Sequence, residues 1–173
     1  MIPHHIRDFD IIVIGELFIE FRCEGDISLS NTYKKDIGGA DVYVASSAAK
    51  LGSGVSFVSA AANDPFHSLI RERLKSLEIN TDHLKTCDGY NGIYFISSQT
   101  PDYREYLFHR PGSASIQIAP SMIYDNLLLN SRIVYASSEL QSVSKAARHT
   151  VFNALNAAHI NNLMVAYDPN LRL

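Results

Sequence analysis

The sequence has few cysteines, no large excess of one charge and no long apolar run. Its 173 residues include two cysteines, Cys23 and Cys87, without metal-ligand spacing around them. We therefore expect free thiols in a reducing cytoplasm. A net charge of −3 offers little attraction to nucleic acid or to an anionic membrane. No stretch approaches the ~18 apolar residues of a membrane span. The sequence predicts a cytoplasmic protein without nucleic-acid or membrane partners.

Motifs of several enzyme classes are also missing. The sequence contains no Walker A glycine loop and no nucleophile elbow, and residues 52–57 (GSGVSF) lack the third glycine of a dinucleotide-binding fingerprint. The pair His4-His5 stands near the N-terminus without partner ligands, so we expect no metal site. Any catalytic or binding function must therefore rest on other residues.

What the chain does contain is an alternation of short β-branched runs with helical patterns. DIIVIG (10–15) is a continuous apolar run, which is typical of a strand buried on both faces. The predicted strands cover residues 10–15, 55–60, 132–136 and 163–167, and the predicted helices cover 40–51, a segment starting at Asp64-Pro65, and 143–159. This rhythm predicts an α/β fold with a mainly parallel sheet flanked by helices.

The middle of the chain breaks this rhythm. Residues 93–96 and 103–109 are aromatic and β-branched, and the turn-rich segment 99–102 separates them. This pattern predicts an antiparallel hairpin. We place it outside the main sheet, in a small β-lid built from about residues 16–36 and 92–110.

Candidate site residues follow the predicted strands, because ligands of open α/β sheets bind beyond the carboxyl ends of the strands. These candidates are Glu16, Glu20, Gly38-Gly39 before the first helix, and Asp168, Asn170 and Arg172 after the last strand. Paired glycines let backbone N–H groups approach a ligand, and an arginine can clamp a carboxylate or phosphate. Each feature taken singly is more often a turn or an exposed charge than a binding site, so the pattern alone does not decide between the two interpretations.

Four segments together resemble the PfkB (ribokinase-like) family of carbohydrate kinases. They are DIIVIGELFIEF, the long segment from GGADVYVASSAAKLGSG to DPFHSLIRERLKSLEINTDHL, NGIYFISSQTPDYREYLFHRPGSAS, and VAYDPNLRL. They occur in the family's order and cover the chain from Asp10 to Leu173. The resemblance is to the N-terminal part of such a kinase.

The resemblance implies an ATP-dependent enzyme that phosphorylates a sugar hydroxyl, with 2-keto-3-deoxygluconate or a fructose-like sugar as substrate. The positions that would contact the sugar or sugar acid are Glu20, Gly38, Gly39, Tyr94, Arg110 and Arg172. Arg172 would face the carboxylate of an acid sugar. ATP and Mg²⁺ are implied by the family, but their site would lie outside this chain.

The chain departs from the family pattern at several positions. Tyr43 stands where the signature has asparagine, Ala62 and His67 replace glycines, and Phe108 stands where a tyrosine is expected. The catalytic motif Gly-Ala-Gly-Asp is absent, so we predict a sugar-binding part truncated on its C-terminal side and inactive alone. The alternative is a catalytically inactive PfkB-like binding or interaction module. In either case we expect a homodimer through the lid or the exposed sheet edge.

Overall fold

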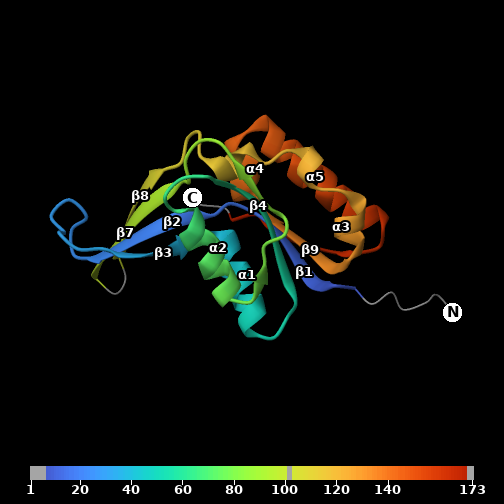
Figure 1. The fold of residues 1–173 in the computed structure, drawn as a ribbon, viewed down its shortest axis with the longest axis horizontal. Coiled ribbons are helices and arrows are strands. Elements are labelled where there is room, and N and C mark those ends of the chain that lie inside the picture. Colours follow the sequence, from blue (N-terminus) through green and yellow to red (C-terminus); the bar gives the residue numbers. More distant parts are fainter. Residues whose placement is uncertain (1–6, 101–102, 171–173) are drawn as a thin grey trace.

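The computed structural model describes residues 7–100 and 103–170, and its strands form two sheets (Figure 1). Within these residues the larger sheet, called the main sheet below, has six parallel strands in the order β10-β9-β1-β4-β5, with β6 also pairing with β4. The strands are β1 (Phe9–Ile14), β4 (Val55–Ala62), β5 (Ile79–Asn80), β6 (Leu84–Cys87), β9 (Ser131–Ser137) and β10 (Met164–Asp168). The predicted parallel α/β fold is confirmed.

Helices cover both faces of the main sheet because alternate strand residues point to opposite faces. Ile11 and Val13 join an apolar cluster with α1 and α2, whereas Ile12 and Ile14 join a second cluster with α3, α4 and α5. The helices are α1 (Ala40–Lys50), α2 (His67–Ser76), α3 (Asp125–Leu129), α4 (Ser138–Val143) and α5 (Lys145–Ile160). Figure 1 shows α1 and α2 on one side and α3 to α5 on the other. The continuous apolar runs of the strands are explained by this double burial.

The second sheet, called the small sheet below, lies beyond the carboxyl end of β1 (Figure 1). Its order is β3-β2-β7-β8, with β2 parallel to β7 and antiparallel pairing at the other two contacts. The strands are β2 (Phe18–Glu24), β3 (Lys34–Gly38), β7 (Ile93–Thr100) and β8 (Tyr103–His109). The two segments that were expected to form the β-lid thus build a sheet of their own. Only a short turn, residues 15–17, joins it to β1.

Two predicted helix boundaries were wrong. The helix expected over residues 143–159 is α5, which begins two residues later, at Lys145, because Ser144 caps it by accepting a hydrogen bond from Ala147 N at 3.0 Å. The helix expected to start at Asp64-Pro65 starts at His67 instead. Asp64 Oδ1 accepts from Phe66 N at 2.8 Å and Oδ2 accepts from Asn91 N at 2.8 Å, so this carboxylate holds a turn before the helix.

Segment 111–130, for which no element was predicted, contains two short 3₁₀ turns, η1 (Ala114–Gln117) and η2 (Pro120–Met122), followed by α3. Among the described residues, no helix combines the length and the apolar character needed to cross a membrane.

Candidate functional site

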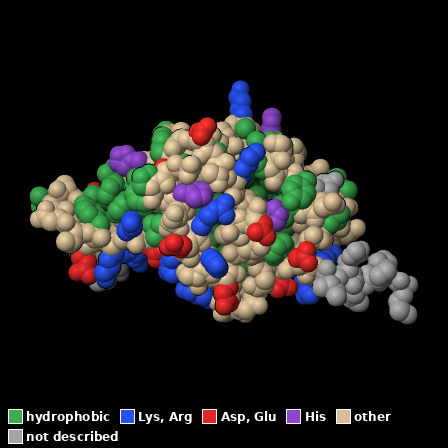
Figure 2. Space-filling model, viewed as in Figure 1, with side chains coloured by type: hydrophobic (Ala, Val, Ile, Leu, Met, Phe, Trp, Pro, Cys, Tyr) green, Lys and Arg blue, Asp and Glu red, His purple; other side chains and the backbone are tan. Residues whose placement is uncertain are grey.

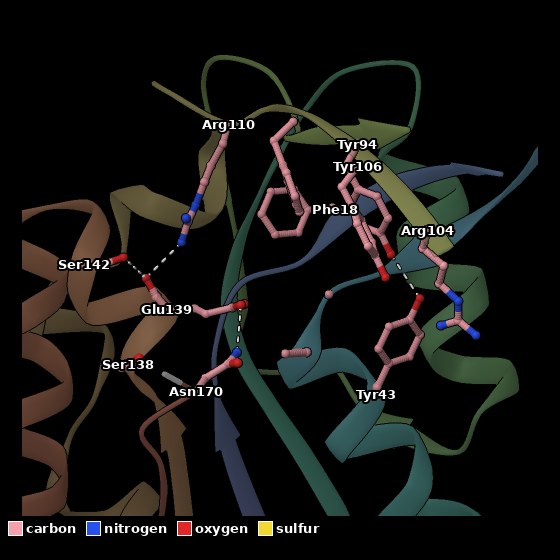
Figure 3. Close-up of a pocket in the computed structure, with 13 residues that line it drawn as sticks. Phe18, Tyr43, Tyr94, Arg104, Tyr106, Arg110, Ser138, Glu139, Ser142 and Asn170 are labelled. Carbon is pink, nitrogen blue, oxygen red and sulfur yellow. Dashed lines mark hydrogen bonds between the residues drawn. The ribbon is translucent and has the colours of Figure 1, made fainter. Parts of the chain in front are cut away.

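A cavity of about 680 Å³ lies between the small sheet and the carboxyl ends of the main-sheet strands. Figure 3 shows its walls: the small sheet and α1 on one side, and α4 with the turn after β10 on the other. This position agrees with the expectation that ligands of α/β sheets bind beyond the carboxyl ends of the strands. Its lining residues are Phe18, Gly39, Ala40, Tyr43, Tyr94, Arg104, Tyr106, Phe108, Arg110, Ser138, Glu139, Ser142 and Asn170.

The end of the cavity next to the main sheet, called the inner end, is polar. Arg110 donates through Nε to Glu16 Oε1 at 3.0 Å and through Nη2 to the other oxygen of the same carboxylate. Its Nη2 also donates to the backbone carbonyl of Glu139 at 2.9 Å, and Glu139 Oε1 accepts from Asn170 Nδ2 at 2.8 Å (Figure 3). With Ser138 and Ser142, these groups can donate to and accept from ligand hydroxyls.

Burial raises the pKa of the Glu16 carboxyl, and its hydrogen bonds with Arg110 oppose that rise. Because Glu16 is 1% exposed, the Arg110 guanidinium is what allows a charged carboxylate here. Arg110 therefore supports the buried acid and lines the cavity at the same time.

A second buried acid, Asp41, lies in the first turn of α1. Its Oδ2 accepts from the backbone N–H of Glu16 at 2.9 Å. Burial raises the pKa of Asp41 from 3.8 to about 7, despite the hydrogen bond from Glu16. A Cβ on Gly15 would lie 2.2 Å from Asp41 Cβ, so glycine is required where β1 meets α1. Asp41 thus ties α1 to the turn that leads into the small sheet.

Glu20 is the centre of a hydrogen-bond network on the small sheet. Its Oε1 accepts from Arg22 Nε at 3.0 Å and Nη2 at 2.8 Å, and its Oε2 accepts from the hydroxyls of both Tyr43 and Tyr94. These two hydroxyls are 3.0 Å apart. Burial, followed by the hydrogen bond with Glu20, raises the pKa of both tyrosines. Both tyrosines therefore act as neutral donors to Glu20.

Aromatic rings form the wall of the cavity on the small sheet. Phe108 packs against Phe18 with ring centroids 5.7 Å apart, against Tyr94 at 5.2 Å and against Tyr106 at 6.0 Å. Tyr106 and Phe108 share one face of β8 because side chains alternate along a strand. Such a wall suits the apolar face of a sugar ring, while the inner end suits its hydroxyls.

The structure brings most of the predicted site residues together. Gly39, Tyr94 and Arg110 line the cavity. Glu20 instead lines a neighbouring hollow of about 540 Å³ and is covered by the two tyrosines. Gly38 lines neither hollow, but a Cβ there would lie 2.2 Å from the Tyr94 hydroxyl, so it makes room for the Glu20 network. Arg172 lies outside the described residues.

Several lining residues were not among the predicted site residues. The alternation of the predicted hairpin indicated that Arg104, Tyr106 and Phe108 share one face of a strand. It did not indicate that this face lies toward the cavity. Glu139 and Ser142 lie on α4, a helix of six residues that the helical pattern did not reveal. Asn170 combines both interpretations given to its motif: its N–H donates to Asp168 Oδ1 at 2.8 Å in a turn, and its side chain lines the cavity.

Within residues 7–100 and 103–170, no three His, Cys, Asp or Glu side chains converge to hold a metal ion. Glu139 is the one carboxylate among the cavity-lining residues of this part of the chain.

Residues 8–173 match the family model described as pfkB family carbohydrate kinase. A 5-dehydro-2-deoxygluconokinase of Listeria innocua is 26% identical over 174 residues, which cover 98% of this chain and 53% of that protein. A probable chloroplastic fructokinase-6 of Arabidopsis thaliana is 27% identical over 167 residues, covering 94% of this chain and 43% of that protein. The chain spans about half the length of the curated relatives it matches.

The same partial coverage is found among solved structures. The crystal structure of a 2-dehydro-3-deoxygluconokinase of Thermotoga maritima superposes with a TM-score of 0.88 at 21% identity, over 94% of this chain and 51% of that one. At this identity the likeness shows the fold. It agrees with the strand order and the second sheet described above.

Proposed function

Because the chain belongs to the pfkB family of carbohydrate kinases, we propose that its cavity binds the sugar substrate of an ATP-dependent kinase. The observation that carries the proposal is the arrangement of the cavity. An aromatic wall that includes Phe108 faces polar groups at the inner end, and both border the carboxyl ends of the parallel strands. Sugars have apolar ring faces and hydroxyl edges, which these two surfaces match.

We propose 2-keto-3-deoxygluconate or a fructose-like sugar as the substrate. Gly39, Tyr94 and Arg110 border the proposed sugar site directly. Glu20 and Gly38 act behind them through the tyrosine network, and Arg172 is proposed to meet the carboxylate of an acid sugar.

Phosphoryl transfer needs a general base and groups that stabilise charge on the transferred phosphoryl group. The family resemblance assigns both to a Gly-Ala-Gly-Asp motif, which is not among these 173 residues. We therefore propose that these residues bind the sugar and that ATP and Mg²⁺ are held elsewhere in the enzyme.

A calorimetric titration with 2-keto-3-deoxygluconate and with fructose tests this proposal. Phe108→Ala removes a ring from the cavity wall, and we expect it to weaken sugar binding by about tenfold. Leu107→Ala is the matched control, because Leu107 is exposed to a similar extent (47% against 44%) and does not line the cavity. The proposal fails if neither sugar binds at millimolar concentration, or if the two variants weaken binding equally.

A second candidate function, an interaction module, is favoured by the surface of the small sheet. All seven residues of β8 are exposed, among them Tyr103, Tyr106, Leu107 and Phe108, and Figure 2 shows apolar side chains gathered over this part of the molecule. β10 is a second edge strand, with Met164 64% exposed. Such surfaces favour self-association, so we propose a homodimer through the small sheet or the β10 edge. A monomer in sedimentation velocity experiments across the micromolar range would contradict it.

We also propose a cytoplasmic location without nucleic-acid or membrane partners. The support is that Cys23 and Cys87 are both free and that the net charge is −3.

A further inference from the structure

Tyr43 separates two hollows on the face of the small sheet. It lines the cavity of about 680 Å³ and also the neighbouring hollow of about 540 Å³, which Glu20, Arg22 and Lys34 line as well. Its ring rises from the first turns of α1 and its hydroxyl reaches the Tyr94 hydroxyl across the gap (Figure 3). Tyr43 therefore forms part of the boundary of both hollows.

The same side chain covers the carboxylate of Glu20. Glu20 is 4% exposed, and both of its oxygens already accept two hydrogen bonds, one pair from Arg22 and one from Tyr43 and Tyr94. A carboxylate has about four acceptor positions, so none is left for a ligand hydroxyl. An asparagine at position 43 is too short to reach this position, so one acceptor position of Glu20 Oε2 would then be open.

The end of the cavity near Tyr43, called the outer end, carries a positive charge. Arg104 lies on the same face of β8 as Tyr106 and lines the cavity, but it makes no ion pair with any described residue. Figure 3 shows it beside Tyr43, across the cavity from the inner end with Arg110 and Glu139. Arg110 differs from it because its charge is matched by Glu16.

From this arrangement we propose that Tyr43 and Arg104 determine specificity by selecting a sugar with an anionic group at the outer end. Tyr43 occupies an acceptor position of Glu20 that would otherwise be open to a ligand hydroxyl, and Arg104 supplies a guanidinium, without an ion pair to any described residue, that binds a carboxylate or a phosphate. The hydroxyl-rich part of the ligand then lies at the inner end. This inference rests on the proposed sugar-binding function and narrows it to sugar acids or sugar phosphates, with Arg104 in place of Arg172 as the partner of the anionic group.

The test is a calorimetric comparison of three sugars with the purified protein: fructose, which is neutral, 2-keto-3-deoxygluconate, which has a carboxylate, and fructose 6-phosphate. We expect at least one anionic sugar to bind about tenfold or more tightly than fructose, as a charge-assisted hydrogen bond implies. Arg104→Gln should remove this preference. Whichever anionic sugar loses affinity in Arg104→Gln identifies the anionic group.

Matched variants separate this effect from general changes in charge or folding. Lys34→Gln makes the same charge change on the same sheet, but Lys34 does not line the cavity, so the preference should persist. Tyr43→Asn should strengthen fructose binding relative to the anionic sugars by uncovering Glu20. Tyr43→Phe keeps the ring and removes only the hydroxyl, so its effect should be smaller, and circular dichroism confirms that each variant is folded.

The outcomes are distinguishable. If the protein binds these sugars without preferring an anionic one, or if Arg104→Gln and Lys34→Gln behave alike, the inference is wrong while the sugar-binding function stands. If folded Tyr43→Asn has the same ratio of fructose affinity to anionic-sugar affinity as the unmodified protein, the role assigned to Tyr43 is also wrong. If no sugar binds to any variant, the proposed function and this inference fail together.

Discussion

Strand β4 of the main sheet and strand β8 of the small sheet differ in how far their side chains are buried. In β4 of the main sheet all eight residues are buried, whereas in β8 of the small sheet all seven are exposed. The main sheet is covered by helices on both faces, and the small sheet turns its aromatic wall toward a cavity. Apolar burial is therefore greatest in β4, whereas β8 presents side chains to the proposed sugar site, as Tyr43 on α1 also does.

The junction between the two sheets shows why they are not independent. The turn after β1 carries Glu16, whose carboxylate binds Arg110 and whose backbone N–H binds Asp41 at 2.9 Å. Three segments far apart in the sequence meet there. The cavity is thus positioned by buried polar contacts as well as by the apolar core, which Ile19 of β2 and Ile37 of β3 join.

The largest expected difference between the sheets is in core truncation. Phe57, on β4, is fully buried, so Phe57→Ala should lower the free energy of unfolding by about 3–5 kcal/mol. Leu107→Ala, on the exposed strand β8, should change it by about 0.5 kcal/mol or less. Urea denaturation of both variants measures this contrast. Equal losses would mean that the small sheet contributes to the cooperative core as much as the main sheet does.

A second prediction concerns pH and the junction between the sheets. The pKa of Asp41 is raised from 3.8 to about 7 on folding, so the folded state binds the proton more tightly than the unfolded chain. Between pH 3.8 and about 7, the free energy of unfolding should therefore be highest at the acidic end and should fall as the pH rises. The loss is on the order of a few kcal/mol, because Asp41 is almost completely buried.

Asp41→Asn provides the control, since asparagine keeps an acceptor for the Glu16 N–H and has no charge to bury. Unfolding in urea at several pH values between about 5 and about 8 should show a flatter profile for this variant. If both proteins have the same slope, the pH dependence arises from other groups, of which Glu16 is the first to test.

The smallest expected effect is electrostatic and confined to the small sheet. Arg22 on β2 and Lys34 on β3 are directly opposite each other, and like charges in this position are destabilising. Lys34→Gln should therefore stabilise the protein by about 0.5 kcal/mol in low salt. Lys35→Gln should do the reverse by a similar amount, because the Lys35 ammonium lies 5.6 Å from the centre of the Phe66 ring. If the melting temperatures of both variants shift in the same direction, these opposite expectations are wrong.

Much of the main sheet could be predicted from local pattern. β1, β4, β9 and β10 lie within one or two residues of the predicted strands, because a strand buried on both faces needs a continuous apolar run. The hairpin of β7 and β8 was predicted in the same way from aromatic and β-branched residues around a turn. The family could also be recognised, since its motifs occur in order along the chain.

Only the tertiary structure decided which side chains meet at the candidate site. Tyr43 was identified only as a departure from a motif, yet its hydroxyl meets Glu20 and Tyr94, which are 23 and 51 positions away in the sequence. The ion pair of Arg110 with Glu16 spans 94 positions. A local pattern reports which face of a strand or helix is apolar, but it does not report which distant side chain fills the space opposite. Whether a carboxylate such as Glu20 is open to a ligand or covered depends on that partner, and therefore on the assembled fold.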